Sequence, residues 1–571
     1  MPKEETFSFK NLFVPLTTKK IIVFIFLIGF VLFFNSLFNG FVLDDNGQIL
    51  NNNSIHSLFN IIDIFMNHIH AREVDNYFRP LPIVFYTIIY SIFQENSFFF
   101  HLVQVLFHIS NAVLIFLIFK KFLKQHIAFF IALIFLIHPI NVEAVVYISG
   151  LQDVLFVFFG LLALYLLQND SYKLKRIIFV NIFLLFSIFS KETGALFFVI
   201  CFMYVYLFRK NKLLLHSVLS LVVGLIYLAA RLMSNVPFRN IPVVPIMRLS
   251  LPERAMSIPA IIFYYIKTFF YPKNLAAAHA WTIRSIQINT FFMPLLFDVL
   301  FFLILFLICF LVIKKKYCIP GIFFIIWFIL GLTIHLQLFP LDMTVADRFF
   351  YFPIIGLLAL IGLFLNNLKF SRSDRYVSIG LAVVILTALA IRTFVRNTNW
   401  YSQTTIVTHD ERVEKNDYLL ELLMSTDLIQ HGKFTEALPY ARKAVALYPQ
   451  SWIAWGNVGL VYQSQNDYRH AKQAYLQSLS IANYYLAYEN LALLLLNNET
   501  LTTARNFIIK ANNLYPNSEK LWYYRIITSY KLGDNLDAIY AAKQYYILRQ
   551  DQESYTILYY LQRNIPINIT E

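Results

Sequence analysis

Apolar residues in the first 400 positions of the chain form long runs separated by short polar loops. A helix needs about 20 apolar residues to cross the hydrocarbon core of a bilayer. Counted this way, the pattern predicts an all-α, multi-pass transmembrane bundle of about 11 spans. The predicted spans are 20–38, 98–119, 126–147, 152–168, 176–190, 193–209, 213–231, 291–313, 319–338, 349–366 and 377–395.

Two further apolar stretches, 81–94 and 255–271, are short, and we expect both to lie along the membrane surface. If 81–94 crossed the membrane, several of the following Lys/Arg clusters would be placed outside, against the positive-inside rule. The charges therefore predict a cytoplasmic N-terminus (1–19) and a membrane domain over 20–399. They also predict a first outer loop at 39–97 and an outer cap loop at 232–290, where repeated prolines exclude one long helix.

The pattern changes near Trp400, where helix-forming, charged and small residues replace the apolar runs. Ala437, Ala471, Ala504 and Ala538 recur at intervals of 34, 33 and 34 residues. This helix-turn-helix period is typical of tetratricopeptide (TPR) repeats. We expect a linker at 400–416, a C-terminal TPR α-solenoid at 417–550, and a capping helix and tail at 551–571.

The amino-acid composition narrows the class of protein further. The chain is 58% hydrophobic with 59 Phe, and its net charge of +14 comes largely from loops beside apolar runs. Such charges orient spans in the membrane, so we do not expect nucleic acid binding. The three cysteines lie in or beside apolar runs and indicate neither a disulfide framework nor a zinc site. The first apolar run lacks a cleavage site and is interpreted as a retained span.

Ionisable residues gather at the predicted outer ends of the spans. Asp44 and Asp45 follow the first span directly, and such residues at a membrane edge are functional candidates. Carboxylates suit acid/base chemistry and cations suit phosphate, so together they fit a phosphorylated lipid. The other candidates are Arg79, His101, His138, Glu143, Asp153, Lys191, Glu192, Asp347 and Arg348.

These residues stand in short motifs that occur in a fixed order. They are Phe41–Asp45, Arg79–Leu81, His101–Val103 with His108, His138–Val145, Gly150–Asp153, Ser190–Gly194 and Ala346–Pro353. With the repeats behind them, they resemble the transmembrane and TPR-containing protein O-mannosyltransferases. More broadly, they resemble GT-C glycosyltransferases that use polyprenyl-phosphate sugars.

The resemblance implies transfer of a sugar, such as the hexose mannose, from a polyprenyl-phosphate donor to a hydroxyl acceptor, with protein Ser/Thr expected. It implies inversion, with Asp44 as base and Asp45 orienting it, although the reverse assignment stays open. Arg348, with Lys191 or Arg79, would hold the phosphate. The chain departs from the family in having Asp347 in place of Glu and Gln152 in place of a basic residue.

Several alternatives stay open. His138 could cap a helix kinked at Pro139, or it could bind a divalent metal ion together with Glu143 and Asp153. The TPR groove could bind the acceptor or a partner protein. The chain could also be a non-enzymatic membrane scaffold, or a transporter, although its charges lie at the outer rim. The Lys-, Ile-, Asn- and Phe-rich usage suggests a bacterial plasma (inner) membrane, with the repeats outside the cytoplasm.

Overall fold

The structure is a computed structural model, and it describes residues 16–66, 77–169, 174–234, 236, 242–313, 318–369 and 371–567. Every regular element in these ranges is helical, which confirms the predicted all-α class. The chain forms two compact units, Met1–Lys415 and Asn416–Glu571. Most of the predicted cytoplasmic N-terminus and the end of the predicted tail lie outside the described residues.

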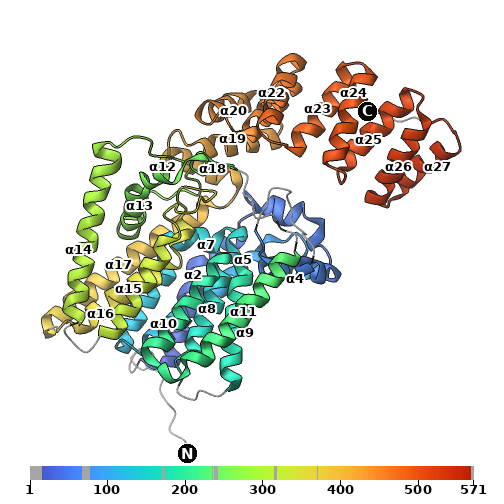
Figure 1. The fold of residues 1–571 in the computed structure, drawn as a ribbon. Coiled ribbons are helices and arrows are strands. Elements are labelled where there is room, and N and C mark those ends of the chain that lie inside the picture. Colours follow the sequence, from blue (N-terminus) through green and yellow to red (C-terminus); the bar gives the residue numbers. More distant parts are fainter. Residues whose placement is uncertain are drawn as a thin grey trace, which may run out of the picture. The chain divides into compact units, whose positions relative to one another are not determined.

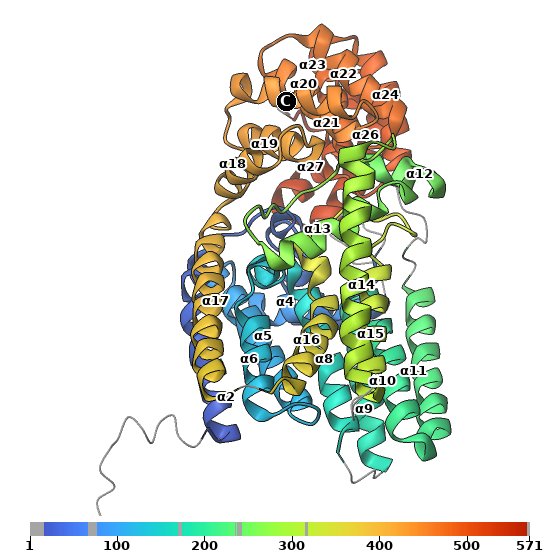
Figure 2. The same ribbon diagram turned by 90° about the vertical axis from the view of Figure 1, so that its left-hand side faces the viewer.

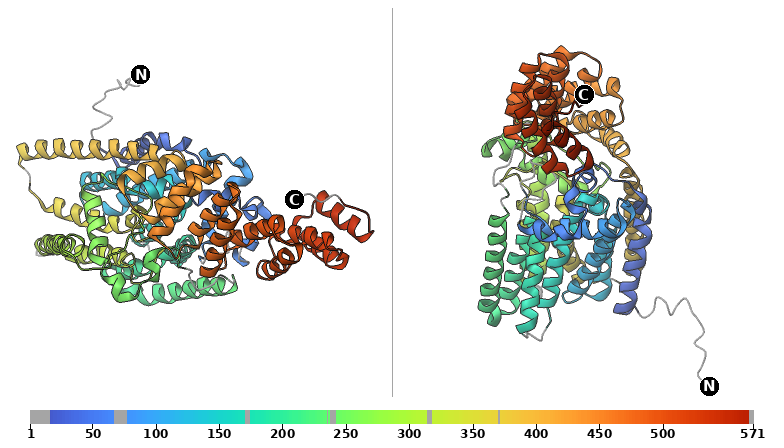
Figure 3. Two further views of the ribbon diagram at one scale, coloured as in Figure 1. Left: turned by 90° about the horizontal axis from the view of Figure 1, so that it is seen from above. Right: turned by 90° about the vertical axis from the view of Figure 1, so that its right-hand side faces the viewer.

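Each of the eleven apolar runs contains helix. Figure 1 labels these helices, and Figure 2 shows α2, α11, α14 and α17 running roughly parallel. In the right-hand view of Figure 3, from the opposite side, α2 (blue) and α11 (green) again run roughly parallel. The helices are α2 (Thr18–Phe33), α5 (Ser97–Phe119), α6 (Gln125–Ile137), α7 (Val142–Val146), α8 (Leu151–Leu167), α9 (Leu174–Ser190), α10 (Ala195–Phe208), α11 (Leu213–Met233), α14 (Met293–Ile313), α15 (Cys318–Thr333), α16 (Pro353–Asn367) and α17 (Arg372–Asn399).

Within the described residues, six helices are long and apolar enough to cross a membrane. They become seven if α6 and the segment Pro139–Val146, bent by 50°, count as one broken span. Helices α9, α10, α15 and α16 have 17, 14, 16 and 15 residues. At 1.5 Å per residue these measure roughly 21–26 Å, less than the ~30 Å hydrocarbon core. The count of eleven spans therefore stays a prediction for these four helices.

Side-chain contacts join the predicted cytoplasmic ends of several spans. The Asn366 side chain accepts a hydrogen bond from the Lys124 backbone at 2.9 Å, and Lys120 donates to Thr18 at 3.4 Å. The Gln168 side chain donates to the Ile118 carbonyl at 3.4 Å. These residues lie at or next to the ends of α2, α5, α6, α8 and α16 that the charge pattern assigned to one side, so these helices alternate in direction as expected.

The opposite end of the bundle carries short, bent elements in place of long helices. The first outer loop contains η2 (Asn46–Leu50), η3 (Asn53–Ile55), η4 (Leu58–Asn60) and α3 (Ile61–Met66), followed by α4 (Pro80–Phe93). Between α6 and α8 the chain forms η5 (Pro139–Asn141), α7 and η6 (Ile148–Gly150). The cap loop contains η9 (Pro245–Arg248), α12 (Leu251–Ala255) and α13 (Ile258–Phe270). Prolines stand in the first turn of α4, η5, η9, α12 and α13, where the missing N–H costs no helical hydrogen bond.

The second unit contains four helix pairs and a final helix, which confirms the predicted TPR solenoid. The pairs are α19 (Tyr418–Gln430) with α20 (Phe434–Leu447), α21 (Trp452–Ser464) with α22 (Tyr468–Ile481), α23 (Tyr485–Asn498) with α24 (Leu501–Leu514), and α25 (Glu519–Lys531) with α26 (Asn535–Arg549), followed by α27 (Gln552–Gln562). The four periodic alanines are fully buried, because a small side chain lets paired helices approach.

Residues 400–416, which the composition presents as a linker, contain helix α18 (Gln403–Val413). The Asp410 carboxylate of this helix is buried in the first unit. It accepts a hydrogen bond from the Ala277 backbone at 2.6 Å and pairs with Arg396 at 3.1 Å. A polar sequence can therefore belong to a folded unit when its few charges are paired inside that unit.

Candidate functional site

The two adjacent aspartates of the first outer loop have opposite environments. Asp44 is exposed, whereas Asp45 is fully buried. The Asp45 carboxylate accepts hydrogen bonds from the Ser149 backbone at 2.8 Å, the Ser149 hydroxyl at 2.6 Å and the Val42 backbone at 3.0 Å. Burial raises the pKa of Asp45 to about 7, although these hydrogen bonds act in the opposite direction. Asp45 therefore fastens the loop, and Asp44 is the carboxylate left accessible to a substrate.

The backbone before Asp44 adopts an uncommon conformation that presents this side chain. Leu43 has a φ of +53°, a left-handed value that non-glycine residues seldom adopt. The Gln403 side chain accepts a hydrogen bond from the Leu43 backbone at 3.2 Å, and the Tyr401 carbonyl accepts one from Gly40 at 3.0 Å. Contacts from the end of the membrane domain thus hold the loop in a conformation that it would not adopt alone.

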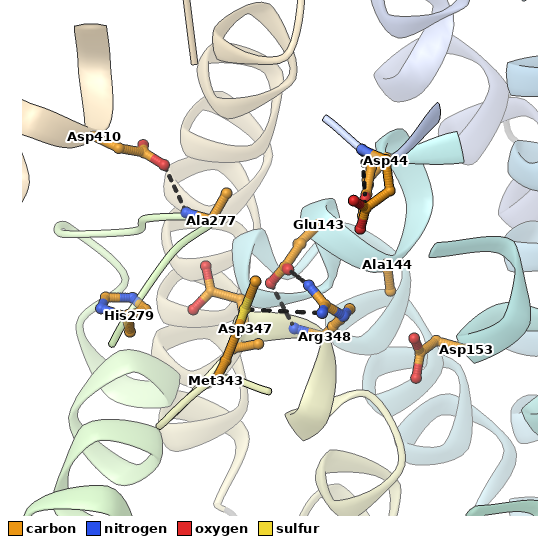
Figure 4. Close-up of polar contacts among 12 residues, drawn as sticks. Asp44, Glu143, Ala144, Asp153, Ala277, His279, Met343, Asp347, Arg348 and Asp410 are labelled. Atoms are coloured by element: carbon orange, nitrogen blue, oxygen red, sulfur yellow. Dashed lines mark hydrogen bonds and ion pairs between the residues drawn. The ribbon is translucent and has the colours of Figure 1, made fainter. Parts of the chain in front are cut away.

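Arg348 and Glu143 form the central ion pair of the site, shown in Figure 4. The Arg348 guanidinium donates to one oxygen of Glu143, and the Arg348 backbone N–H donates to the other at 3.0 Å. Both residues are buried, and they come from the turn before α16 and from α7. Such a pair fixes the guanidinium beside the turn from which it projects.

Two more cations lie in the same region. Lys191 pairs with Asp153 at 2.6 Å, and Arg79 donates to Glu192 at 2.8 Å and to Gln152 at 2.6 Å. Burial lowers the pKa of Lys191, and the neighbouring Asp153 opposes that effect.

The aromatic ring of Phe349 lies close to two of these cations. Its ring centroid lies 5.4 Å from Lys191 Nζ and 5.3 Å from the Arg348 guanidinium. One aromatic face thus brings together two positive groups that the chain separates by more than 150 positions.

Asp347 faces away from the neighbouring Arg348. Its carboxylate accepts a hydrogen bond from the Tyr264 hydroxyl at 2.6 Å, and that hydroxyl lies 3.0 Å from His279 Nε2. In Figure 4, Asp347 extends to the side of His279, whereas Asp153 lies on the opposite side of Arg348. Burial and the nearby Glu143 raise the pKa of Asp347 to about 8.

The structure gives both candidate histidines backbone partners. His101 Nε2 lies 3.1 Å from the Asn39 carbonyl, at the beginning of the first outer loop. His138 Nε2 lies 2.9 Å from the Phe269 carbonyl, and its Nδ1 accepts a hydrogen bond from the Ile140 backbone at 3.2 Å. His138 therefore caps the turn at Pro139, which was one of the two roles considered for it from the sequence. It also contacts the cap loop through the Phe269 carbonyl.

The three candidate metal ligands do not gather. His138 contacts backbone, Glu143 pairs with Arg348, and Asp153 pairs with Lys191. Throughout the part of the chain that the structure describes, no group of three or more His, Cys, Asp or Glu side chains is placed to hold a metal ion. The arrangement of the described side chains thus lends no support to a metal site.

The sequence did not identify three residues that shape the site: Tyr147, Ser149 and Phe349. The Tyr147 hydroxyl donates to Asp44 at 2.9 Å, and Ser149 holds Asp45. Each lies within or next to a motif that was recognised, but hydroxyl and aromatic side chains are common at membrane edges. Only the contacts in the structure distinguish these three residues from other hydroxyl and aromatic side chains of the chain.

Two family models match parts of this chain. A family model described as dolichyl-phosphate-mannose-protein mannosyltransferase matches residues 79–233, and a tetratricopeptide repeat model matches residues 453–485. The human protein O-mannosyl-transferase TMTC3 is 24% identical over 500 residues, covering 79% of this chain and 54% of the relative. The Drosophila melanogaster protein O-mannosyl-transferase Tmtc3 is 23% identical over 544 residues, covering 79% of this chain and 58% of the relative.

The chain is similar to protein O-mannosyltransferases. This finding confirms the resemblance drawn from the motifs. The chain spans about half the length of the curated relatives it matches. Among solved structures, ArnT from Cupriavidus metallidurans in the apo state aligns with a TM-score of 0.40 and 15% identity, over 80% of this chain and 79% of that chain.

Proposed function

We propose that this protein is a membrane glycosyltransferase that moves one sugar from a polyprenyl-phosphate donor to a hydroxyl of an acceptor protein. The observation that carries the proposal is the exposed Asp44 carboxylate, presented at the same end of the bundle as Arg348, Lys191 and Arg79. A base and a set of cations are the two features that transfer from a phosphate leaving group requires. The similarity to protein O-mannosyltransferases supports mannose as the sugar and Ser or Thr as the acceptor.

The reaction is a single inverting displacement. Asp44 takes the proton of the acceptor hydroxyl as that oxygen attacks the anomeric carbon of the donor. The new oxygen–carbon bond forms while the bond from that carbon to the phosphate oxygen breaks, and the electron pair leaves with the polyprenyl phosphate. Arg348 and Lys191 stabilise the negative charge that develops on the departing phosphate.

Each of the three cations has a carboxylate partner within the protein. Arg348 is held by Glu143, Lys191 by Asp153 and Arg79 by Glu192. An incoming phosphate does not have to displace these partners, because a guanidinium carries five N–H donors and an ammonium three. The pairs keep the cations oriented, and they offset the cost of burying positive charge before the donor arrives.

The direct test uses purified protein in lipid nanodiscs with tritiated mannosyl-phosphoryl polyprenol and an immobilised library of Ser/Thr peptides. The expected result is tritium on peptides that is released by β-elimination, as for a sugar attached to Ser or Thr. Absence of label with mannosyl, glucosyl and galactosyl donors alike would contradict a transferase.

The scaffold alternative remains a second candidate because the TPR unit can serve partner binding alone. It predicts that deleting the gene removes an envelope complex while leaving the hexose content of envelope proteins unchanged. Mass spectrometry of those proteins from cells with and without the gene separates the two. We place the protein in a bacterial inner membrane, with the repeats on the outer side, as part of the same proposal.

A further inference from the structure

Tyr147 makes the closest side-chain contact to the exposed Asp44 carboxylate among those given above. Its hydroxyl donates to Asp44 Oδ2 at 2.9 Å and accepts a hydrogen bond from the Asp44 backbone N–H at 3.3 Å. One phenol oxygen thus contacts both the side chain and the main chain of the same residue. A single side chain with these two contacts restricts both the rotamer and the backbone of Asp44.

The phenol is itself held from several directions. Tyr147 is buried, and its ring stacks on Trp400 with centroids 5.4 Å apart. The Gln104 amide donates to the Tyr147 carbonyl at 2.7 Å and to the Ala144 carbonyl at 2.6 Å. The guanidinium of Arg396 lies 5.7 Å from the Trp400 ring centroid. Because ring and backbone are both fixed, the hydroxyl is a preorganised donor.

The neighbouring contacts separate the roles of the two aspartates. Ser149, two residues after Tyr147, holds the buried Asp45, whereas Tyr147 holds the exposed Asp44. A single turn of the chain between α7 and α8 thus supplies one hydroxyl to each carboxylate. An exposed carboxylate without such a contact would sample several rotamers, and only some would reach an acceptor hydroxyl.

We propose that Tyr147 is a positioning residue that fixes the Asp44 carboxylate in the orientation needed to accept the acceptor proton. This inference rests on the proposed function, since it assigns Tyr147 to the base of that reaction. Tyr147 does not touch the reacting atoms and acts only through Asp44. Its hydroxyl should therefore matter only while Asp44 is a carboxylate.

The experiment is a double-mutant cycle between Tyr147→Phe and Asp44→Asn, with purified full-length protein in nanodiscs. The probes are tritiated mannosyl-phosphoryl polyprenol and the Ser/Thr peptide library, with both kcat and the donor KM measured. Tyr147→Phe keeps the ring that stacks on Trp400, so the protein should fold. Tyr86→Phe is the matched control, because the Tyr86 hydroxyl donates at 2.9 Å to a backbone group of the same turn, the Ile148 carbonyl.

In the wild-type background, Tyr147→Phe should lower kcat by about 10- to 100-fold, as expected for a hydrogen bond to a charged group, with donor KM within about twofold. In the Asp44→Asn background, the same change should alter kcat by less than about twofold, because coupled residues are not additive. Tyr86→Phe should have equal effects in both backgrounds.

Equal losses from Tyr147→Phe in the two backgrounds would show a purely structural role and overturn the proposal, as would a wild-type rate in the single variant. If Asp44→Asn itself transfers at the wild-type rate, the assignment of the base fails, and the role of Tyr147 fails with it. If the effects of the two substitutions are simply additive, the positioning role of Tyr147 is rejected. The proposed transferase activity and its base, Asp44, would still stand.

Discussion

At the residue scale, two chemically identical side chains of the site differ in burial. Asp44 and Asp45 are adjacent in sequence, and no pattern of residue types distinguishes a base from an anchor between them. The difference arises from partners more than 100 positions away, at Tyr147 and Ser149. The sequence could identify the acidic pair and favour Asp44, but the buried role of Asp45 required the fold.

Arg348 provides a test of the proposed phosphate site. Arg348→Gln should raise the donor KM at least about tenfold, because a cation that pairs with phosphate helps to bind the ground state. The single change also strands the buried Glu143 without its partner, at a cost of about 3–5 kcal/mol. The Arg348→Gln, Glu143→Gln double variant should therefore be recovered in higher yield by size-exclusion chromatography and still show the raised KM. A double variant with wild-type KM would place the phosphate elsewhere.

The raised pKa of Asp45 predicts a pH dependence of stability. A carboxyl whose pKa is near 3.8 when unfolded and about 7 when folded binds more protons in the native state between those values. Its contribution to stability is full below the unfolded value and is lost as pH rises through about 7.

Thermal unfolding in detergent should show this loss as a fall in Tm between pH 5.5 and pH 8.5. Asp45→Asn should have a lower Tm at pH 5.5, since an amide cannot accept from three donors at once, and a flatter profile. Asp347→Asn is the control, because Asp347 is another buried carboxyl at the same end of the bundle whose pKa is raised. Parallel wild-type and Asp45→Asn profiles would mean that Asp45 does not titrate in this range.

At the element scale, the periodic pattern predicted helices well and their breaks less well. The run 126–147 was predicted as one span, whereas the structure divides it at His138 and Pro139 and bends the two parts by 50°. The freed backbone groups are satisfied by His138 and by Asn141, which donates to the Phe135 carbonyl at 2.7 Å. Hydropathy does not encode such local replacements for helical hydrogen bonds. Pro139 allowed the His138 cap to be considered from the sequence, whereas the Asn141 contact required the fold.

The TPR pairs give a test of packing between helices. A Cβ placed on Gly459 in α21 would lie 2.6 Å from the Tyr475 ring in α22, so no larger residue fits without movement. Gly459→Val should destabilise the TPR unit by about 1–3 kcal/mol through overpacking, a loss only partly offset by valine's higher helix propensity relative to glycine.

The matched control is Gly456→Val on the same helix, where the nearest side-chain atom is 3.3 Å away in Tyr484. Thermal unfolding followed by tryptophan fluorescence of the full chain should report a larger loss for the first variant. Equal losses would mean that the close α21–α22 contact at Gly459 does not set the cost.

At the scale of the whole molecule, hydropathy predicted the helical bundle, and the regular spacing of small residues predicted the TPR solenoid. They did so because burial in lipid demands continuous apolar helices and because stacked repeats demand small residues at fixed intervals. The span count for the four shorter helices and the side of the membrane stay predictions, since helix length and composition alone do not define a membrane position.

Membrane sidedness is testable by labelling a variant in which Cys201, Cys309 and Cys318 are replaced by serine. A cysteine at the exposed Lys433 should react with a membrane-impermeant maleimide in intact cells, and one at the exposed Lys121 should react only after lysis. This follows from the positive-inside rule applied to the loops. The reverse labelling would place the repeats in the cytoplasm and separate the site from an extracytoplasmic acceptor.

The central claim is that Asp44 is the base of a sugar transfer, and its most direct test is the rate of Asp44→Asn. The amide keeps the size of the side chain and its hydrogen bond to Tyr147 but cannot take the acceptor proton. Transfer of tritiated mannose from mannosyl-phosphoryl polyprenol to peptide should fall by about 10²–10⁴, with donor binding retained. A well-folded Asp44→Asn protein that transfers at the wild-type rate would contradict the account.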